Sequence, residues 1–335
     1  MKLLFRMKPQ GAFYGGNDFF SAQDFPFPRS DTVFQALLSA WDMLWGKEEK
    51  NHLLSCFKNQ HTPPFFMTSF FPVMGDVYFL PRPLALQIES SERQKKIEKA
   101  VSWISANIYK EWLEGKDIVY FSDYFLGPSA YFHSSELRFL EDLCPSKLLW
   151  SSDKGRMRNR LSVFMEKAQA YPAEQVYYSQ NMEFYLIVEV EESYKTKLEA
   201  AFRFLAEEGI GGQRSIGCGS FLYEEPRFLP KILNFLEKPV EKNYVVLSLY
   251  YPQAKEKSMF HEAYWEIIER QGWTRDEHGQ SRQNKAIRLL KEGSCFSSMP
   301  DHTKALIEVT PSQSKKETCY HYVYPFRVVA PGGKI

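Results

Sequence analysis

The residues best suited to chemistry in this chain form a glycine-rich loop. Residues 209–221 read Gly-Ile-Gly-Gly-Gln-Arg-Ser-Ile-Gly-Cys-Gly-Ser-Phe. Because glycine has no Cβ, it adopts positive φ and lets another backbone come close. Successive amides in such a loop can turn toward an anion, and Arg214 adds a guanidinium group that suits phosphate. The loop therefore indicates a phosphate-bearing partner rather than bond-breaking chemistry.

Two familiar nucleotide-binding loops do not fit this segment. It contains no lysine, whereas a P-loop ends in Gly-Lys-Ser/Thr. A dinucleotide-binding loop follows a strand and opens a helix, whereas this one closes a predicted helix over 195–208 and opens a strand. Gly209 stands where a left-handed C-cap residue belongs, so we expect it to be structural and expect Gly211–Gly219 to carry any function. The alternative is a tight helix-to-strand connection that binds nothing.

A second candidate for phosphate binding is a row of basic residues. Four cations stand at every second position: Lys154, Arg156, Arg158 and Arg160. On an extended strand all four would point to one face. Like charges so placed repel one another unless an anion lies among them. The alternative is a mobile loop whose charges are solvated.

Two further pairs of residues could contact phosphate. Lys285 and Arg288 belong to a basic run over 281–291, which forms a cationic stripe if it is helical and a weaker signal if it is a strand. Arg29 and Ser30 precede a predicted helix, whose N-terminus can bind an anion. The aspartate that follows them opposes an anion there, and helix capping suits Ser30 better.

Residue types needed for other chemistry are scattered. There is no Gly-x-Ser-x-Gly or Cys-x-x-Cys motif, and the seven histidines show no His-x-x-x-His spacing. No acidic cluster is built for magnesium. The sequence thus predicts no catalytic residue, metal or cofactor, although a single histidine could still serve as a general base in an RNA-cleaving site.

Length and composition narrow the class of protein. A chain of 335 residues forms one large domain or two ordinary ones, and a net charge of +1 means that positive charge for a nucleic acid must be local. Five scattered cysteines fit a reduced cytosolic compartment. The N-terminus is interrupted by charges and proline too early for a signal peptide, and no apolar run reaches the length of a membrane span.

The elements that position the candidate residues follow from hydrophobic periodicity. Alternating apolar residues predict strands over 3–7, 183–191 and 244–251, near 286–296, 305–309 and 320–329, and a short strand from residue 220. The Pro/Phe-rich stretch 63–84 is predicted to be extended chain or an edge strand. Helical spacing predicts helices over 31–45, 91–114, 195–208 and 259–271. A proline-containing, charged stretch at 226–243 marks a domain boundary.

This order of elements predicts an α+β protein of two ferredoxin-like (RRM-like) domains. The first would span 1–228, with a large insertion at about 90–180 and the Gly-rich loop at 209–221. The second would span 240–335 and would be degenerate, because it lacks its last helix.

Five sequence blocks, in order along most of the chain, resemble those of a known family. They are 30–37 (Ser-Asp-Thr-Val-Phe-Gln-Ala-Leu), the Pro/Phe block at 64–84, the loop at 209–221, Gly-Trp at 272–273 together with 285–296 and its Glu-Gly-Ser, and Val-Thr-Pro at 309–311. The family is the RAMP-superfamily, Cas5-like subunit that holds the 5′ tag of the guide RNA in Csm (type III-A CRISPR) effector complexes. Two positions depart from its pattern: Ile216 stands where a second serine is common, and Val-Tyr-Pro at 323–325 replaces Arg-Tyr-Gly.

The resemblance implies a cytoplasmic, antiviral ribonucleoprotein subunit that binds RNA and catalyses nothing. Its partners would be the 5′ tag of the crRNA, the large polymerase-like (HD/Palm) subunit and the backbone RAMP subunit, with no membrane and no cofactor. The candidate RNA contacts are Gly211, Gly212, Gln213, Arg214, Ser215, Ile216, Gly217, Gly219, Arg29, Ser30, Arg82, Lys154, Arg156, Arg158, Arg160, Lys285 and Arg288.

Two other functions remain open at this stage. One is a metal-independent endoribonuclease of the related RAMP type that processes crRNA, which would need a His, Tyr or Lys side chain near the Gly-rich loop. In that family, however, the loop tends to lie near the C-terminus, whereas more than a hundred residues follow it here. The other is an assembly protein in which the loop only packs.

Overall fold

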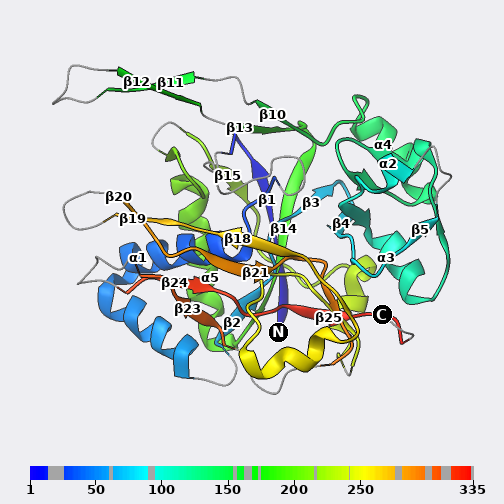
Figure 1. Cartoon of the computed structure of the whole chain (residues 1–335). Helices are drawn as coiled ribbons and strands as arrows, with labels where there is room; N and C mark the ends of the chain where they lie inside the picture. Colours follow the sequence, from blue (N-terminus) through cyan, green and yellow to red (C-terminus); the bar gives the residue numbers. More distant parts are fainter. Residues whose placement is uncertain are drawn as a thin grey trace.

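The structure is a computed structural model of the whole chain (Figure 1). It describes residues 1–13, 26–59, 63–89, 95–153, 157–161, 168–172, 175–214, 217–240, 242–275, 281–298, 304–310 and 318–332.

A large, mainly antiparallel sheet organises the N-terminal part of the chain. Among the described residues its strand order is β15-β1-β14-β3-β4-β6-β9-β8, and β2 also pairs with β14. The strands are β1 (Lys2–Pro9), β2 (Phe65–Met67), β3 (Phe71–Met74), β4 (Val77–Pro81), β6 (Trp103–Ser105), β8 (Phe125–Leu126), β9 (Ala130–Tyr131), β14 (Met182–Val190) and β15 (Phe221–Tyr223). The predicted strands at 3–7 and 183–191 and the short strand from residue 220 are confirmed. The Pro/Phe block at 63–84 is extended as predicted, but its assignment to an edge strand is wrong, because β3 pairs with both β14 and β4 inside the sheet.

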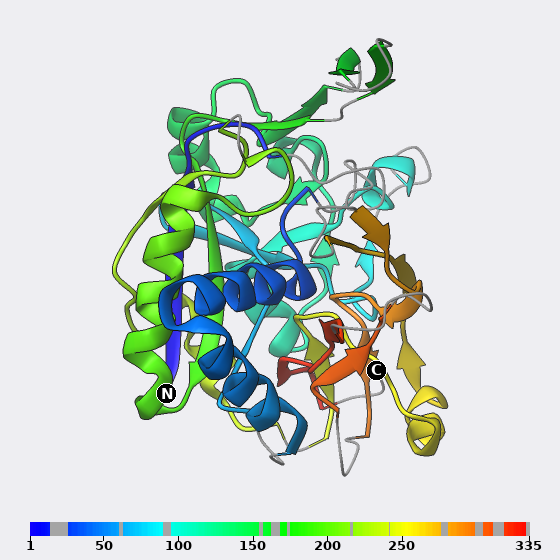
Figure 2. The same ribbon diagram turned by 90° about the vertical axis from the view of Figure 1, so that its left-hand side faces the viewer.

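Two helices pack together beside this sheet (Figure 2). Helix α1 (Ser30–Asn59) continues past its predicted end at residue 45, with a break at Gly46, where φ is 84°. It continues because Leu53 and Phe57 of its second segment are buried. Helix α5 (Glu192–Glu208) follows the prediction and packs Phe202 on Phe5 of β1, with ring centroids 4.6 Å apart.

The segment between β4 and β14 covers the range 90–180 that is predicted to be an insertion. It holds β5 (Ile88–Glu89), α2 (Lys95–Glu98), α3 (Ala106–Leu113), β7 (Ile118–Val119), α4 (Leu137–Leu143), β10 (Trp150–Asp153), β11 (Met157–Leu161), β12 (Ala168–Pro172), β13 (Gln175–Tyr178) and the 3-10 helices η1 (Ser122–Tyr124) and η2 (Ser134–Glu136). The β11–β12 pair projects above the body in Figure 1. The single helix predicted over 91–114 is wrong: the buried run Trp103–Ser105 instead pairs with β4 and β9, because an apolar run that is buried on both faces is more stable within the sheet.

The C-terminal part is built from short strands. One sheet has the order β17-β22-β16-β25, and the pairs β18–β21, β19–β20 and β23–β24 flank it. Their bounds are β16 (Tyr244–Val246), β17 (Ala263–Tyr264), β18 (Ile267–Arg270), β19 (Trp273–Arg275), β20 (Ser281–Gln283), β21 (Ile287–Leu290), β22 (Cys295–Phe296), β23 (Leu306–Glu308), β24 (Tyr320–Tyr322) and β25 (Arg327–Val329), with 3-10 helices η4 (Lys231–Glu237) and η5 (Ala254–Phe260).

The helix predicted over 259–271 is also wrong. That stretch holds the end of η5 and the strands β17 and β18. Strand β18 pairs with β21 from Ile267↔Leu290 to Arg270↔Ile287. The apolar residues of this stretch have helical spacing, but they form a strand. Pairing with residues about twenty positions further along overrides their local propensity.

The two parts of the chain share one apolar core. A single cluster of buried side chains includes Leu37 of α1, Ile187 of β14, Val245 of β16 and Tyr322 of β24. Backbone bonds cross the same boundary: the Ser69 N–H donates to the Leu247 carbonyl at 3.0 Å. Within the described residues, no helix is both long and apolar enough to cross a membrane.

Candidate nucleic-acid interface

The Gly-rich loop connects α5 to β15 and is anchored at both ends. The Gly209 N–H donates to the Leu205 carbonyl at 2.8 Å and closes the helix with φ of 81°. The Gly219 N–H donates to the Ala12 carbonyl at 3.0 Å, just beyond the end of β1. The Gln175 side chain of β13 donates to the sulfur of Cys218 at 3.4 Å. The loop therefore has a fixed place beside the ends of β1 and β13.

Two of its glycines are needed by the fold. A Cβ on Gly219 would lie 2.1 Å from the carbonyl oxygen of Ile210, and one on Gly209 would lie 2.9 Å from that of Cys218. The amides of Gly217 and Gly219 already donate to internal carbonyls. We therefore revise the expectation of an amide nest over the whole of Gly211–Gly219: these two amides are not available to phosphate, and Gly219 is buried.

The part of the loop that faces solvent is shorter. Arg214 and Gly217 are exposed, and Gly211 and Gly212 are partly exposed. A Cβ on Gly217 would meet nothing within 4 Å, although its φ of 83° still favours glycine. Ser215 and Ile216 lie outside the described residues. The loop thus offers one guanidinium group and an open glycine surface.

Gln213 has an unusual conformation in this loop. It adopts φ of 57°, a left-handed value that is uncommon for a residue with a side chain. Its Oε1 atom is buried and has no hydrogen-bond donor among the described residues. Because buried polar atoms are nearly always paired, this unpaired acceptor is an uncommon feature of the loop.

The basic row falls on the β11–β12 hairpin. Arg158 and Arg160 occupy alternate positions of β11, opposite Tyr171 and Gln169 of β12. Residues 157–161 are a strand, so the condition under which alternate cations share one face holds for this part of the row. Lys154 and Arg156 lie outside the described residues.

The two candidate RNA contacts in the C-terminal part, Lys285 and Arg288, are exposed. Lys285 lies in the turn before β21, where its N–H donates to the Val309 carbonyl at 3.0 Å. Arg288 lies on β21, so this run is a strand and not a helical cationic stripe. The Arg288 side chain is 77% exposed and lies 3.6 Å from the Glu269 carboxylate.

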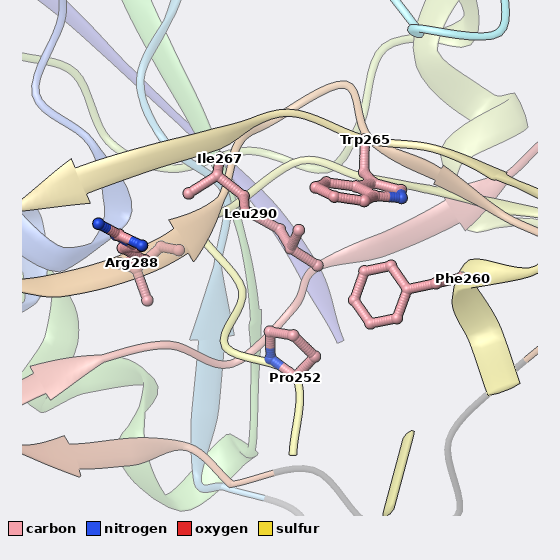
Figure 3. A pocket seen from close by; sticks show the side chains of 7 residues that line it. Pro252, Phe260, Trp265, Ile267, Arg288 and Leu290 are labelled. Carbon is pink, nitrogen blue, oxygen red and sulfur yellow. The ribbon is translucent and has the colours of Figure 1, made fainter. Parts of the chain in front are cut away.

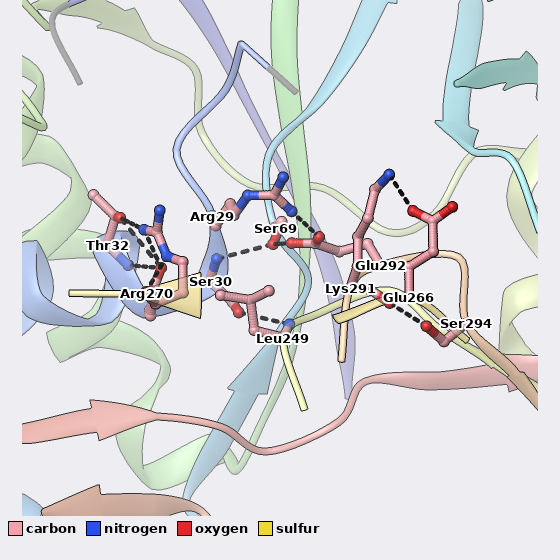
Figure 4. A network of polar contacts seen from close by, with 11 residues as sticks. Arg29, Ser30, Thr32, Ser69, Leu249, Glu266, Arg270, Lys291, Glu292 and Ser294 are labelled. Atoms are coloured by element: carbon pink, nitrogen blue, oxygen red, sulfur yellow. Dashed lines mark hydrogen bonds and ion pairs between the residues drawn. The ribbon is translucent and has the colours of Figure 1, made fainter. Parts of the chain in front are cut away.

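Arg29 and Ser30 do not reach the surface, and this corrects their assignment as RNA contacts (Figure 4). Arg29 is 6% exposed and forms an ion pair with the fully buried carboxylate of Glu292. The Ser30 Oγ accepts from the Leu249 N–H at 3.1 Å, and Ser69 donates to Glu292. Burial lowers the pKa of Arg29, and the nearby Glu292 carboxylate opposes that change. A buried guanidinium group needs such a partner, so both residues join the two parts of the chain.

A second buried ion pair lies beside the first. Arg270 of β18 donates to Asp31 of α1 from Nε at 2.9 Å and from Nη2 at 3.1 Å. Burial alone would raise the pKa of Asp31, but Arg270 and His321 outweigh it and hold that pKa well below its usual range. We call Arg29, Asp31, Arg270 and Glu292 the buried ion cluster. Sequence reasoning missed it, because its partners are far apart in the chain.

Arg82 is also committed to the fold. Its guanidinium group donates to the carbonyls of Leu86 (2.9 Å) and Glu98 (3.0 Å) and to the Glu98 carboxylate (2.6 Å). With only 17% of its side chain exposed, it holds the chain after β4 against α2. We therefore correct its assignment as an RNA contact.

The described residues contain no group of three or more His, Cys, Asp or Glu side chains placed to hold a metal ion. All five cysteines are free thiols. The surface thus carries exposed cations and glycines. The buried ion cluster joins the two parts of the chain.

The fold as a whole is shared with solved CRISPR effector subunits. A chain from the crystal structure of the Csm3–Csm4 subcomplex in the type III-A CRISPR-Cas interference complex matches 98% of this chain and 99% of its own length, at 19% identity and a TM-score of 0.69. A chain from the crystal structure of the Csm1–Csm4 cassette in complex with cA4 matches 99% of this chain and 100% of its own, at 16% identity and a TM-score of 0.58.

Two sequence comparisons find similarity to one kind of subunit over part of the chain. Residues 240–329 match the family described as the CRISPR Csm4 C-terminal domain. A protein of Methanocaldococcus jannaschii described as CRISPR system Cms protein Csm4 is 24% identical over 234 residues, which is 61% of this chain and 61% of that protein. These findings confirm the resemblance to the Csm subunit that the sequence blocks indicated.

Proposed function

We propose that this chain is the RNA-binding subunit of a type III-A CRISPR effector complex that anchors the 5′ repeat-derived tag of the crRNA. In this role it also connects the large polymerase-like subunit to the backbone RAMP subunits. The observation that carries the proposal is the match of residues 240–329 to the Csm4 C-terminal family. The whole-length likeness in fold to chains of the two Csm subcomplexes supports it.

We also propose that the chain consists of two ferredoxin-like units. The strand order β15-β1-β14-β3, with α1 after β1 and α5 after β14, is the arrangement of a ferredoxin-like βαββαβ unit. We assign this unit to residues 1–228, with an insertion at about 90–180. Residues 240–335 form the second, degenerate unit, which contains strands and 3-10 helix but no α-helix among its described residues.

The tag would bind along the exposed part of the Gly-rich loop. Arg214 supplies a charge-assisted hydrogen bond to a phosphate, and Gly211, Gly212 and Gly217 let the RNA backbone come close. The β11–β12 hairpin and the exposed Lys285 would add phosphate contacts.

A non-catalytic role agrees with the surroundings of two of the described histidines. His133 accepts from the Ser135 N–H at the start of η2, and His321 is buried with its Nδ1 atom 3.5 Å from Asp31. An endoribonuclease that processes crRNA would instead need a His, Tyr or Lys side chain beside the Gly-rich loop. Free cysteines are typical of proteins that function in a reduced compartment, and we propose that this chain functions in the cytoplasm.

Binding of the purified protein to single-stranded RNA tests this function. The RNA should carry a repeat-derived 5′ tag, and a matched RNA should lack it. We expect tag-dependent binding, no cleavage product on a gel, and an affinity loss of about tenfold in Arg214→Ala, the cost of one hydrogen bond to a charged group. Arg203→Ala is the matched control, because this exposed arginine lies on α5 outside the loop.

Three results would count against the proposal. Site-specific cleavage that disappears on one His→Ala change would favour the processing endoribonuclease. Equal affinity for tagged and untagged RNA would remove the tag from the proposal. Unchanged affinity in a folded Arg214→Ala variant would mean that the loop only packs.

A further inference from the structure

Strand β13 lies beside the end of β1, where the Gly-rich loop is anchored (Figure 1). Val176 of this strand and Phe13 each donate an N–H to the other's carbonyl at 3.0 Å. Side chains alternate between the two faces of a strand. Val176 is buried, and Tyr178 packs on rings of the core. Gln175 and Tyr177 therefore share the opposite face, which is the face toward the loop.

Two hydrogen bonds connect Tyr177 to the Gly-rich loop. The Tyr177 hydroxyl donates to Oε1 of Gln175 at 3.0 Å, and the amide of Gln175 donates to the sulfur of Cys218 at 3.4 Å. Cys218 follows a turn in which the Gly217 N–H donates to the Arg214 carbonyl at 2.9 Å. A hydroxyl that reaches two residues back along its own strand requires the ring to lean along the strand. The Tyr177 ring thus leans toward the loop that carries Arg214.

Part of the Tyr177 side chain remains accessible beside the loop. Its cross-strand neighbour is Ser151 of β10, which is exposed and has a small side chain. A serine covers little of an aromatic ring. Because its hydroxyl bond limits the orientations of the ring, a molecule that packs on Tyr177 would pay little entropy for ordering it.

An aromatic ring close to a phosphate-binding cation is suited to single-stranded RNA. Proteins hold such RNA by stacking unpaired bases on aromatic side chains while cations contact the phosphates. Arg214 is the exposed cation of the loop, and the glycines beside it leave room for the RNA backbone. Tyr177 would supply the aromatic surface that the loop itself lacks.

A second group of exposed aromatic side chains is less suited to RNA. In the C-terminal part, Trp265 and Arg288 line an apolar pocket (Figure 3). Arg288 lies 3.6 Å from the carboxylate of Glu269, and Lys291 lies 2.8 Å from that of Glu266. These cations and carboxylates balance in number, so a phosphate gains no net attraction there.

We propose that Tyr177 stacks on a base of the crRNA tag next to the phosphate that Arg214 contacts. The inference rests on the proposed function and deepens it, because it names a residue that binds a base and not the sugar-phosphate backbone. Every base has a π-face, so this contact would fix the position of one nucleotide and not its identity. The competing role for Tyr177 is structural: its hydroxyl would only position Gln175 under the loop.

Two variants that lack the hydroxyl separate these roles. Tyr177→Phe and Tyr177→Leu both lose the bond to Gln175, but only the first keeps an aromatic ring. The affinity of the purified full chain for tagged RNA should stay near that of the wild type in Tyr177→Phe and fall about tenfold or more in Tyr177→Leu. The slope of affinity against salt should be the same in both, because stacking neutralises no phosphate. Trp265→Leu is the matched control, because it removes a 43% exposed aromatic ring and should leave RNA affinity unchanged.

Fluorescence reports the stacking itself. 2-Aminopurine, a base whose emission is quenched when it stacks, would be placed in turn at each position of the tag. At one position we expect emission to be quenched in the wild-type and Tyr177→Phe complexes and to be brighter in the Tyr177→Leu complex.

The other outcomes are distinguishable. Equal losses of affinity in Tyr177→Phe and Tyr177→Leu would mean that the hydroxyl positions Gln175 and that the ring stacks on nothing. Wild-type affinity and fluorescence in both variants would remove Tyr177 from the site and leave the proposed function standing. If the wild type itself does not bind tagged RNA, the proposed function fails together with this inference.

Discussion

The carboxylate of Asp31, in the first turn of α1, accepts two hydrogen bonds from the guanidinium group of Arg270, which lies 239 residues later on β18. The two side chains are 2% and 5% exposed. They join the helix that follows β1 to a strand of the C-terminal part, next to the Arg29–Glu292 pair. The two parts of the chain are thus joined by buried charges as well as by a shared apolar core.

Removing one partner of this pair should be costly. Arg270→Met leaves the Asp31 carboxylate buried without its main cation, and we expect a loss of about 3–5 kcal/mol in the free energy of unfolding. The double variant Asp31→Asn/Arg270→Met should lose less than the sum of the two single changes, because neither charge is then left alone. Urea denaturation of the four proteins measures this coupling. Additive losses would mean that the pair contributes no interaction energy.

The same ion pair predicts that the stability of the folded protein depends on pH. The pKa of Asp31 is held well below its usual range in the folded protein. In the unfolded chain the pKa of an aspartate is about 3.9. A lowered folded pKa gives stability that is present above about pH 4 and is lost as the pH falls below it. Between pH 6 and pH 3 the wild type should therefore lose more stability than Asp31→Asn, in urea melts at each pH. Parallel curves for the two proteins would contradict this.

Two glycines of the loop should differ in what they tolerate. Gly219→Ala places a Cβ 2.1 Å from the Ile210 carbonyl oxygen, so we expect about 2 kcal/mol or more of destabilisation in urea melts. Gly217→Val meets open space and should cost only about 1–2 kcal/mol for its positive φ. It should nevertheless weaken tag binding, because its side chain projects into the proposed RNA path. Normal tag affinity in Gly217→Val would remove this glycine from the RNA surface.

The basic hairpin makes a prediction that salt can test. Lys154, Arg156, Arg158 and Arg160 changed together to Ala should lower RNA affinity and flatten its salt dependence. For single strands the slope of log K against log salt becomes shallower by about 0.7 for each phosphate that the protein no longer neutralises. Titrations at several salt concentrations measure the slope, with Arg203→Ala as control. An unchanged slope would show that these four side chains never meet phosphate.

Local pattern was sufficient for the elements nearest the proposed RNA surface. Strand β14 and helix α5 follow from apolar spacing, and Gly209 ends α5 as its C-cap position predicts. The loop after it could be found because glycine and arginine signal their use through residue type alone. Which loop amides are free could not be predicted, because the Gly219 N–H bonds to Ala12, more than two hundred residues earlier.

Long-range contacts decided the rest. Arg29 is a cation like Arg214, but it is buried and forms an ion pair with Glu292, 263 residues away. The stretch 259–271 has helical spacing, yet its residues 267–270 form β18, which pairs with β21. In both cases the deciding partner lies outside any local window of sequence.

The most direct measurement is photo-crosslinking in the reconstituted complex. A crRNA with 4-thiouridine at one position of its 5′ tag would be compared with one labelled only in the guide segment, and the crosslinked peptides would be mapped. We predict that the tag-labelled RNA crosslinks to this chain and that the peptide contains Gly211–Arg214. Crosslinks to this chain from the guide segment alone, or tag crosslinks that fall wholly on other subunits, would contradict the account.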